Sequence, residues 1–216
     1  GIVYQFNGDI IPQRVSDNGI EERILASASV AAYSFFWEGH ELLAIRTDAG
    51  TWLLDATTGQ WCEFKSYGKP NWLPQCASGG LFGSSELGHI LQFSSAHTDL
   101  GGVLERRFRG GFPINGGTVS IKNVRLRVNS GQTPILSGEY SDPVVQMQIS
   151  RDAGQSWGAW KSTKLGVQGQ YRKRVSWRAL GQADEPGVLA EFRCTDPVPF
   201  RVSGVAVNEK NGGRSR

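Results

Sequence analysis

The chain has 216 residues, 39% of them hydrophobic, so it is long enough to bury an apolar core. It has 28 Gly and 9 Pro but no run of 18 apolar residues, which favours short strands and turns and excludes a membrane-spanning helix. The three cysteines are odd in number and widely spaced, which argues against a disulfide framework as the basis of the fold. The start "GIVYQFNGD" has no signal-peptide pattern and no initiator Met, which predicts a processed or truncated chain.

The net charge is only +3, but it is unevenly distributed. Residues 1–100 carry 5 Lys and Arg against 11 Asp and Glu, a net −6, whereas residues 101–216 carry 18 against 9, a net +9. This polarity favours two halves that face different partners or, in a ring of copies, each other. Ordinary solvated faces are the alternative.

Four short strands are predicted in the first third of the chain. "DAG" at residues 48–50 is a loop whose Gly50 is expected to take the positive φ that a three-residue hairpin needs. Tight turns between all four strands predict one up-and-down sheet of the size of a propeller blade. The strands are expected at Tyr33–Trp37, Leu42–Thr47, Thr51–Asp55 and Trp61–Lys65.

A second group of strands is less regular. In the last segment of this group, Val119–Val128, the apolar positions change parity between Ile121 and Val124, which predicts a β-bulge. The segments are Leu81–Gly83, His89–Ser94, Val103–Arg109 and Val119–Val128.

The third group shows the strongest alternation. Val145, Met147 and Ile149 alternate with polar residues, which is typical of a strand with one buried face. Further strands are expected at 157–165, 171–177, 188–194 and 200–207.

The three groups predict an all-β protein, similar to a β-propeller, with about three antiparallel up-and-down sheets as blades. A complete propeller has more blades, so the chain is expected to be part of a larger one; a β-sandwich is the alternative. The expected partition is an entry segment with a partial blade (1–32), a first blade (33–70), a second blade with long loops (71–142), a third blade (143–207) and a flexible tail (208–216).

"SRDAGQSWG" has the spacing of an Asp box, S-x-D-x-G-x-[ST]-W, which is found in sialidases and other propellers. The Ser and Asp side chains can bond the amides of their own turn, Gly supplies a conformation closed to other residues, and Trp is expected to wedge between layers. We therefore interpret the box as structural. Its members are Ser150, Asp152, Gly154, Ser156 and Trp157.

No sequence pattern indicates catalysis. Glycoside hydrolysis needs two placed acidic groups, or a Tyr nucleophile with a carboxylate partner, and no pattern here fixes such a set. His40, His89 and His97 lie apart and have no metal-ligand spacing. We expect no enzymatic activity, no cofactor and no metal.

Two basic clusters are candidate interfaces. "ERRFRG" contains Arg106, Arg107 and Arg109, and "YRKRVSWR" contains Arg172, Arg174 and Arg178. Even spacing on a strand would place the last three on one face, opposite Tyr171, Val175 and Trp177. Such a row can contact the phosphates of DNA without recognising the base sequence, or it can bind an acidic neighbouring subunit. A solvated face is the third alternative.

The order of motifs resembles the packaged-DNA stabilisation proteins of short-tailed bacteriophages, also called tail accessory or nozzle proteins. The blocks are "TWLLDATTGQWCEF", "GHILQFSSAHTD", "VVQMQISRDAGQSWGAWKSTKLGVQGQYRKRVSWRALGQ" and "EFRCTDPV". The most specific series is S-x-D-x-G-x-[ST]-W-G, L-G-x-x-G-x-Y, R-x-x-W-x-x-L-G and F-R-x-x-D-P-V. It is met by Ser150, Asp152, Gly154, Ser156, Trp157 and Gly158, by Leu165, Gly166, Gly169 and Tyr171, by Arg174, Trp177, Leu180 and Gly181, and by Phe192, Arg193, Asp196, Pro197 and Val198.

The resemblance implies a propeller subunit of a homo-hexameric ring in the virion tail, made in the host bacterial cytoplasm. Such a ring would extend the DNA channel below the portal, contact other tail and portal-associated proteins, and help to retain packaged double-stranded DNA until genome ejection. Members of this family are usually longer than this chain. Two alternatives remain open: a glycan-binding or sialidase-like propeller, and a propeller scaffold for cellular protein contacts.

Overall fold

The computed structural model describes residues 1–6, 8, 10–86 and 88–209. The chain divides into two compact units, residues 1–95 and residues from 96 onward. Nearly all regular structure is β, which confirms the all-β prediction. Within the described part of the chain, no helix has the length and apolar character needed to cross a membrane.

The first unit begins with a small hairpin and a helix. Strands β1 (Tyr4–Gln5) and β2 (Gln13–Arg14) pair, and helix α1 (Asn18–Ala26) follows. Asp17 is the N-cap, because its carboxylate accepts a hydrogen bond from the Ile20 amide at 2.9 Å. This helix was not predicted; the cap and Glu21 in the first turn are its sequence signals.

A four-stranded meander follows, as the sequence predicts. Strands β3 (Val30–Trp37), β4 (His40–Thr47), β5 (Thr51–Asp55) and β6 (Gln60–Phe64) pair in chain order. The expected role of Gly50 is wrong, since Gly50 does not have a positive φ. A Cβ at this position would approach the Trp52 ring at 3.0 Å, so the glycine makes room for an aromatic side chain.

A second, three-stranded sheet completes the first unit. It consists of β7 (Pro74–Ser78), β8 (Leu81–Ser84) and β9 (Ile90–Gln92). Phe35 from β3, Phe82 from β8 and the loop residue Trp72 form a buried aromatic core between these strands. The rings of Phe35 and Phe82 meet edge to face with centroids 5.0 Å apart, an arrangement that aromatic pairs favour.

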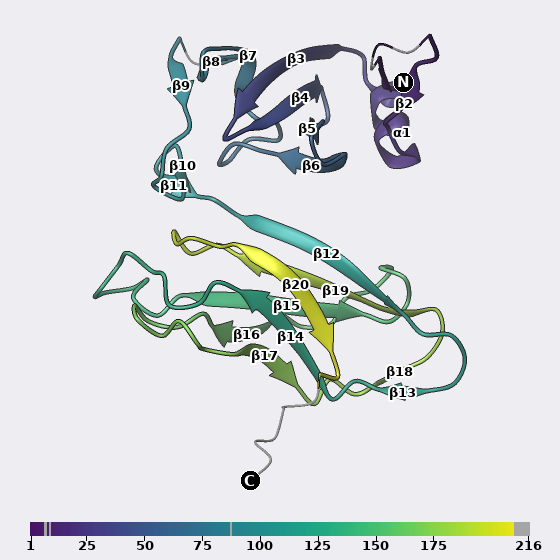
Figure 1. The fold of residues 1–216 in the computed structure, drawn as a ribbon, viewed down its shortest axis with the longest axis vertical. Coiled ribbons are helices and arrows are strands. Elements are labelled where there is room, and N and C mark those ends of the chain that lie inside the picture. Colours follow the sequence, from purple (N-terminus) through teal and green to yellow (C-terminus); the bar gives the residue numbers. More distant parts are fainter. Residues whose placement is uncertain (7, 9, 87, 210–216) are drawn as a thin grey trace. The chain divides into compact units, whose positions relative to one another are not determined.

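The second unit contains two main sheets (Figure 1). After the small hairpin of β10 (Thr98–Asp99) and β11 (Gly102–Val103), the four-stranded sheet has the order β12 (Arg106–Pro113), β19 (Gly187–Cys194), β15 (Val144–Ser150) and β16 (Lys161–Lys164). The three-stranded sheet has the order β17 (Val175–Arg178), β14 (Asn123–Val128) and β20 (Val202–Val207). A short pair joins β13 (Val119–Ser120) and β18 (Gln182–Ala183).

The two main sheets share one apolar core. Met147 and Phe192 of the four-stranded sheet and Val124, Leu126 and Trp177 of the three-stranded sheet are buried in the same cluster. The second unit is therefore a β-sandwich, the alternative that the sequence left open, and its sheets are not successive propeller blades.

The expected blades at 71–142 and 143–207 are wrong for this reason. Strand β12 pairs with β19, about eighty residues further on, and β14 pairs with β17 and β20. Closing a sandwich joins strands that are distant in the sequence, and local alternation carries no signal of the partner.

The parity change near residue 121 marks a change of strand, not a bulge. Strand β13 ends at Ser120 and β14 begins at Asn123, and the two strands belong to different sheets. The amide of buried Ile121 donates to the carbonyl of Gly181 at 2.8 Å. The register irregularity of β14 lies instead between Arg127 and Val128.

Candidate functional site

The outer side of the three-stranded sheet is strongly basic. Alternation along β14 buries Val124 and Leu126 and turns Arg125 and Arg127 outward. In the neighbouring strand β17, Ser176 lies opposite Arg125 and Arg178 lies opposite Asn123. We call this surface, made of Lys122, Arg125, Arg127, Arg174 and Arg178, the basic face.

A depression of about 240 Å³ lies on the basic face. Among the described residues that line it, Glu209 is the one carboxylate. The Glu209 carboxylate pairs with Arg125 at 2.9 Å and with Arg127 at 3.1 Å. The hydrogen bond from Arg125 is the main reason that the pKa of Glu209 lies below its ordinary value. The lining residues are Lys122, Asn123, Arg125, Arg174, Ser176, Arg178 and Glu209.

The start of the expected tail belongs to this surface. The side-chain oxygen of Asn208 accepts from the Lys122 amide at 2.7 Å, and the Asn208 side-chain amide donates to the Ser120 carbonyl at 2.9 Å. Asn208 and Glu209 are therefore anchored. Residues 210–216 of the expected tail lie outside the described residues.

Sequence reasoning found part of the basic face. Arg174 and Arg178 line the depression together, but Arg172 lies in a turn that precedes β17 and does not line it. Tyr171 was expected to share one strand face with Val175 and Trp177; these two are buried, but Tyr171 is 63% exposed and lies in a turn. Arg125 and Arg127 were missed, although their alternation with the apolar residues of "NVRLRV" is the signal that identifies them.

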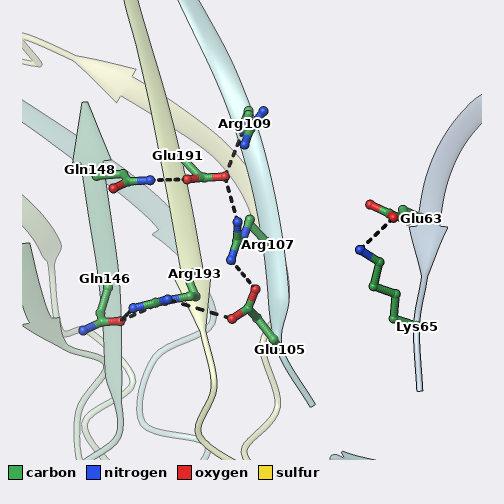
Figure 2. A network of polar contacts seen from close by, with 9 residues as sticks. All are labelled: Glu63, Lys65, Glu105, Arg107, Arg109, Gln146, Gln148, Glu191 and Arg193. Carbon is green, nitrogen blue, oxygen red and sulfur yellow. Dashed lines mark hydrogen bonds and ion pairs between the residues drawn. The ribbon is translucent and has the colours of Figure 1, made fainter. Parts of the chain in front are cut away.

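The outer side of the four-stranded sheet also carries arginines, but they are held by carboxylates (Figure 2). Glu191 accepts from Arg109 at 2.8 Å and lies 3.5 Å from a guanidinium nitrogen of Arg107. Gln148 donates to the other oxygen of Glu191. The Glu191 side chain is only 1% exposed, because these three partners cover it. Burial raises the pKa of Glu191, but the hydrogen bonds from Gln148 and Arg109 outweigh it, and the net pKa is below the ordinary value.

Next to Glu191 on the same strand side, Arg193 is also held by neighbouring polar side chains. Arg193 donates to the Gln146 side-chain oxygen at 2.6 and 3.0 Å, and lies 3.9 Å from Glu105. The Arg193 guanidinium also stacks on Trp160, 4.1 Å from the ring centroid. We call this surface, made of Glu105, Arg107, Arg109, Gln146, Gln148, Glu191 and Arg193, the compensated face.

Arg106 does not belong to either face. It has the parity of Phe108, which packs against the core, so its side chain turns to the inner side of β12. Its guanidinium donates to the carbonyls of Val198 (2.5 Å) and Asp196 and lies over the ring of Phe200. The sequence groups the three arginines of "ERRFRG" as one candidate interface, but the structure places them on two sides of β12. Alternation turns Arg106 inward, while Arg107 and Arg109 turn outward and pair with Glu191.

The Asp-box side chains are engaged within their own turn. The Asp152 carboxylate accepts from the Ser156 amide at 2.8 Å and from the Ser150 hydroxyl at 2.7 Å. The hydrogen bonds from Ser156 are the largest cause of the lowered pKa of Asp152. Gly154 has φ +94°, the conformation expected of it. Trp157, however, does not wedge between the sheets; its ring lies 5.2 Å from the guanidinium of Arg109.

Comparison with protein families gives a match to part of the chain. Residues 110–210 match the family model described as Bacteriophage P22 Gp10, beta-sandwich. The matched segment covers both main sheets apart from the first residues of β12. No curated protein matched the chain. The family match supports a structural protein of a short-tailed bacteriophage, which fits a place in the virion tail beside other tail proteins.

Proposed function

We propose that this protein is a subunit of a homo-oligomeric tail ring that extends the DNA channel and helps to retain packaged DNA. The observation that carries the proposal is the basic face on the sandwich that matches the phage family model. The earlier resemblance to packaged-DNA stabilisation proteins points to the same role, with a hexameric ring that joins portal-associated and other tail proteins.

The spacing of the basic face suits a phosphate backbone. Residues two apart on a strand are separated by about 6.8 Å, and neighbouring strands by about 4.8 Å. Arg125 and Arg127 on β14, with Arg174 and Arg178 at β17, therefore form a grid of cations on one sheet. Such a grid neutralises phosphates through charge and does not read base sequence.

We propose a purely mechanical and electrostatic role, without covalent chemistry. The Asp-box side chains bond their own turn, and the carboxylates nearest the arginines form ion pairs with them. These groups hold the fold and tune its surface charge.

The proposal is tested in the phage that encodes the chain. Particles that carry Arg125→Gln, Arg127→Gln, Arg174→Gln and Arg178→Gln together are expected to assemble tails but to lose packaged DNA, measured as genome that becomes sensitive to nuclease. Particles that lack the protein should lose both the tail ring, seen by electron microscopy, and the DNA. Full particles with a normal tail in the absence of the protein would overturn the proposal.

A further inference from the structure

A second pocket lies in the second unit, away from the residues of either arginine face. Its volume is about 440 Å³. Its polar lining offers hydrogen-bond donors from Arg106, Arg201, Gln132 and His97, and no carboxylate lines it among the described residues. Leu104, Pro199 and Phe200 form an apolar wall.

Arg106 is the fixed cation of this pocket. Its Nη atoms donate to the backbone carbonyls of Val198 and Asp196, and its guanidinium lies 5.6 Å from the centroid of the Phe200 ring. These contacts anchor the group in one orientation. The Nε–H of Arg106 is buried and has no acceptor among the residues that the structure describes. A buried N–H without an acceptor is costly, and a guanidinium half withdrawn from water gains from an anionic partner.

His97 adds a titratable donor to the same pocket. It sits in the left-handed region at φ +54°, just before β10. Burial and the positive charge of Arg106 lower the pKa of His97 below its ordinary value. The other charged lining group is Arg201, which is also cationic. The carboxylate of nearby Asp196 accepts a hydrogen bond from the Val144 amide at 2.7 Å.

We propose that this pocket is an oxyanion site that takes a single phosphate or carboxylate group, held by Arg106 and Arg201 with His97 and Gln132 beside it. The pocket is larger than the depression on the basic face, and the two have no lining residue in common, so it is a separate site. An anion in the pocket offsets the repulsion between His97 and Arg106, so binding and protonation of His97 favour each other. The site is independent of contact between the basic face and DNA.

The test is a titration of the full chain with sulfate and with acetate at constant ionic strength, followed by NMR signals of the His97 ring and the Arg201 amide. These probes keep a constant charge between pH 6 and pH 8. A saturable shift is expected, with binding at least 3-fold tighter at pH 6 than at pH 8. The anion that binds more tightly, sulfate or acetate, shows whether the site prefers a tetrahedral, phosphate-like anion or a planar carboxylate.

Two variants keep the proposal falsifiable. Arg201→Gln is expected to weaken binding at least 5-fold, and His97→Gln to remove the pH dependence, whereas Arg172→Gln, the loss of an exposed arginine elsewhere, should leave both unchanged. Shifts that rise linearly without saturation, or an Arg201→Gln protein that binds as well as the unaltered chain, would overturn the site.

Discussion

The two outer faces of the sandwich have similar numbers of arginines but differ in how many carboxylates accompany them. On the compensated face, Arg107 and Arg109 converge on Glu191, and Arg193 is held by Gln146, Glu105 and Trp160. On the basic face, Arg125 and Arg127 pair with Glu209, which is the one carboxylate among the described residues that line the depression. Arginine content alone thus does not identify a phosphate-binding surface; the number and burial of the carboxylates that accompany it decide the net charge offered to a partner.

The largest expected effect comes from breaking the compensated face. Glu191→Ala should lower the free energy of unfolding by about 3 kcal/mol, because it leaves Arg107 and Arg109 without their common partner and empties a buried position. Denaturant unfolding of the full chain measures this. The matched control is Glu105→Ala, whose carboxylate is 41% exposed and should matter by less than about 1 kcal/mol. Equal losses in the two variants would show that burial of Glu191 is not the source of its importance.

A smaller effect is expected on the basic face, and it concerns DNA affinity. Arg174→Gln with Arg178→Gln should weaken binding to a short DNA duplex about 10-fold at low salt and reduce the slope of log affinity against log salt by about 1.8, since about 0.9 is lost per phosphate contact. Fluorescence anisotropy over a salt series gives both quantities. Arg172→Gln with Lys161→Gln removes the same charge outside the depression. If this control weakens binding as much, net charge rather than the basic face explains the affinity.

The smallest expected effect is a difference in pH dependence. The folded-state pKa of Glu191 lies below its ordinary value of 4.5, so its contribution to stability is present above pH 4.5 and is lost as the pH falls towards the folded-state pKa. Glu191→Gln should therefore flatten the loss of stability below pH 4.5. The measurement is the denaturation midpoint between pH 7 and pH 3 for both proteins. Parallel curves would assign the acid sensitivity to other carboxylates.

Local structure was predictable where the residues that determine it are close together in the sequence. The β3–β6 meander has tight turns between consecutive strands, and alternation around Met147 shows the buried side of β15. The partners of β12 and β14 were not predictable, because their strands lie far along the chain. Arg172 was misplaced because the turn bonds from Gln170 to Val167 and from Lys173 to Gln170 bend the chain until just before Val175. Nothing in a single sequence marks these bonds in advance.

The candidate site shows the same limit. Arg125 and Arg127 could have been identified from alternation, whereas the burial of Glu191 depends on three strands that meet only in the folded sheet. The two arginines of "ERRFRG" that point outward look as available in the sequence as those of the basic face. Their engagement is a property of the pairing of β12 with β19 and of β19 with β15.

The pairing of β12 with β19 also has a mechanical consequence. The two strands form an antiparallel ladder from Arg106 opposite Cys194 to Pro113 opposite Gly187. Ladder hydrogen bonds run perpendicular to the strands, so a pull along the axis of β12 strains all of them at once instead of opening them one after another. Because the chain enters the sandwich through this strand, a pull along the axis of β12 would load the whole ladder in shear.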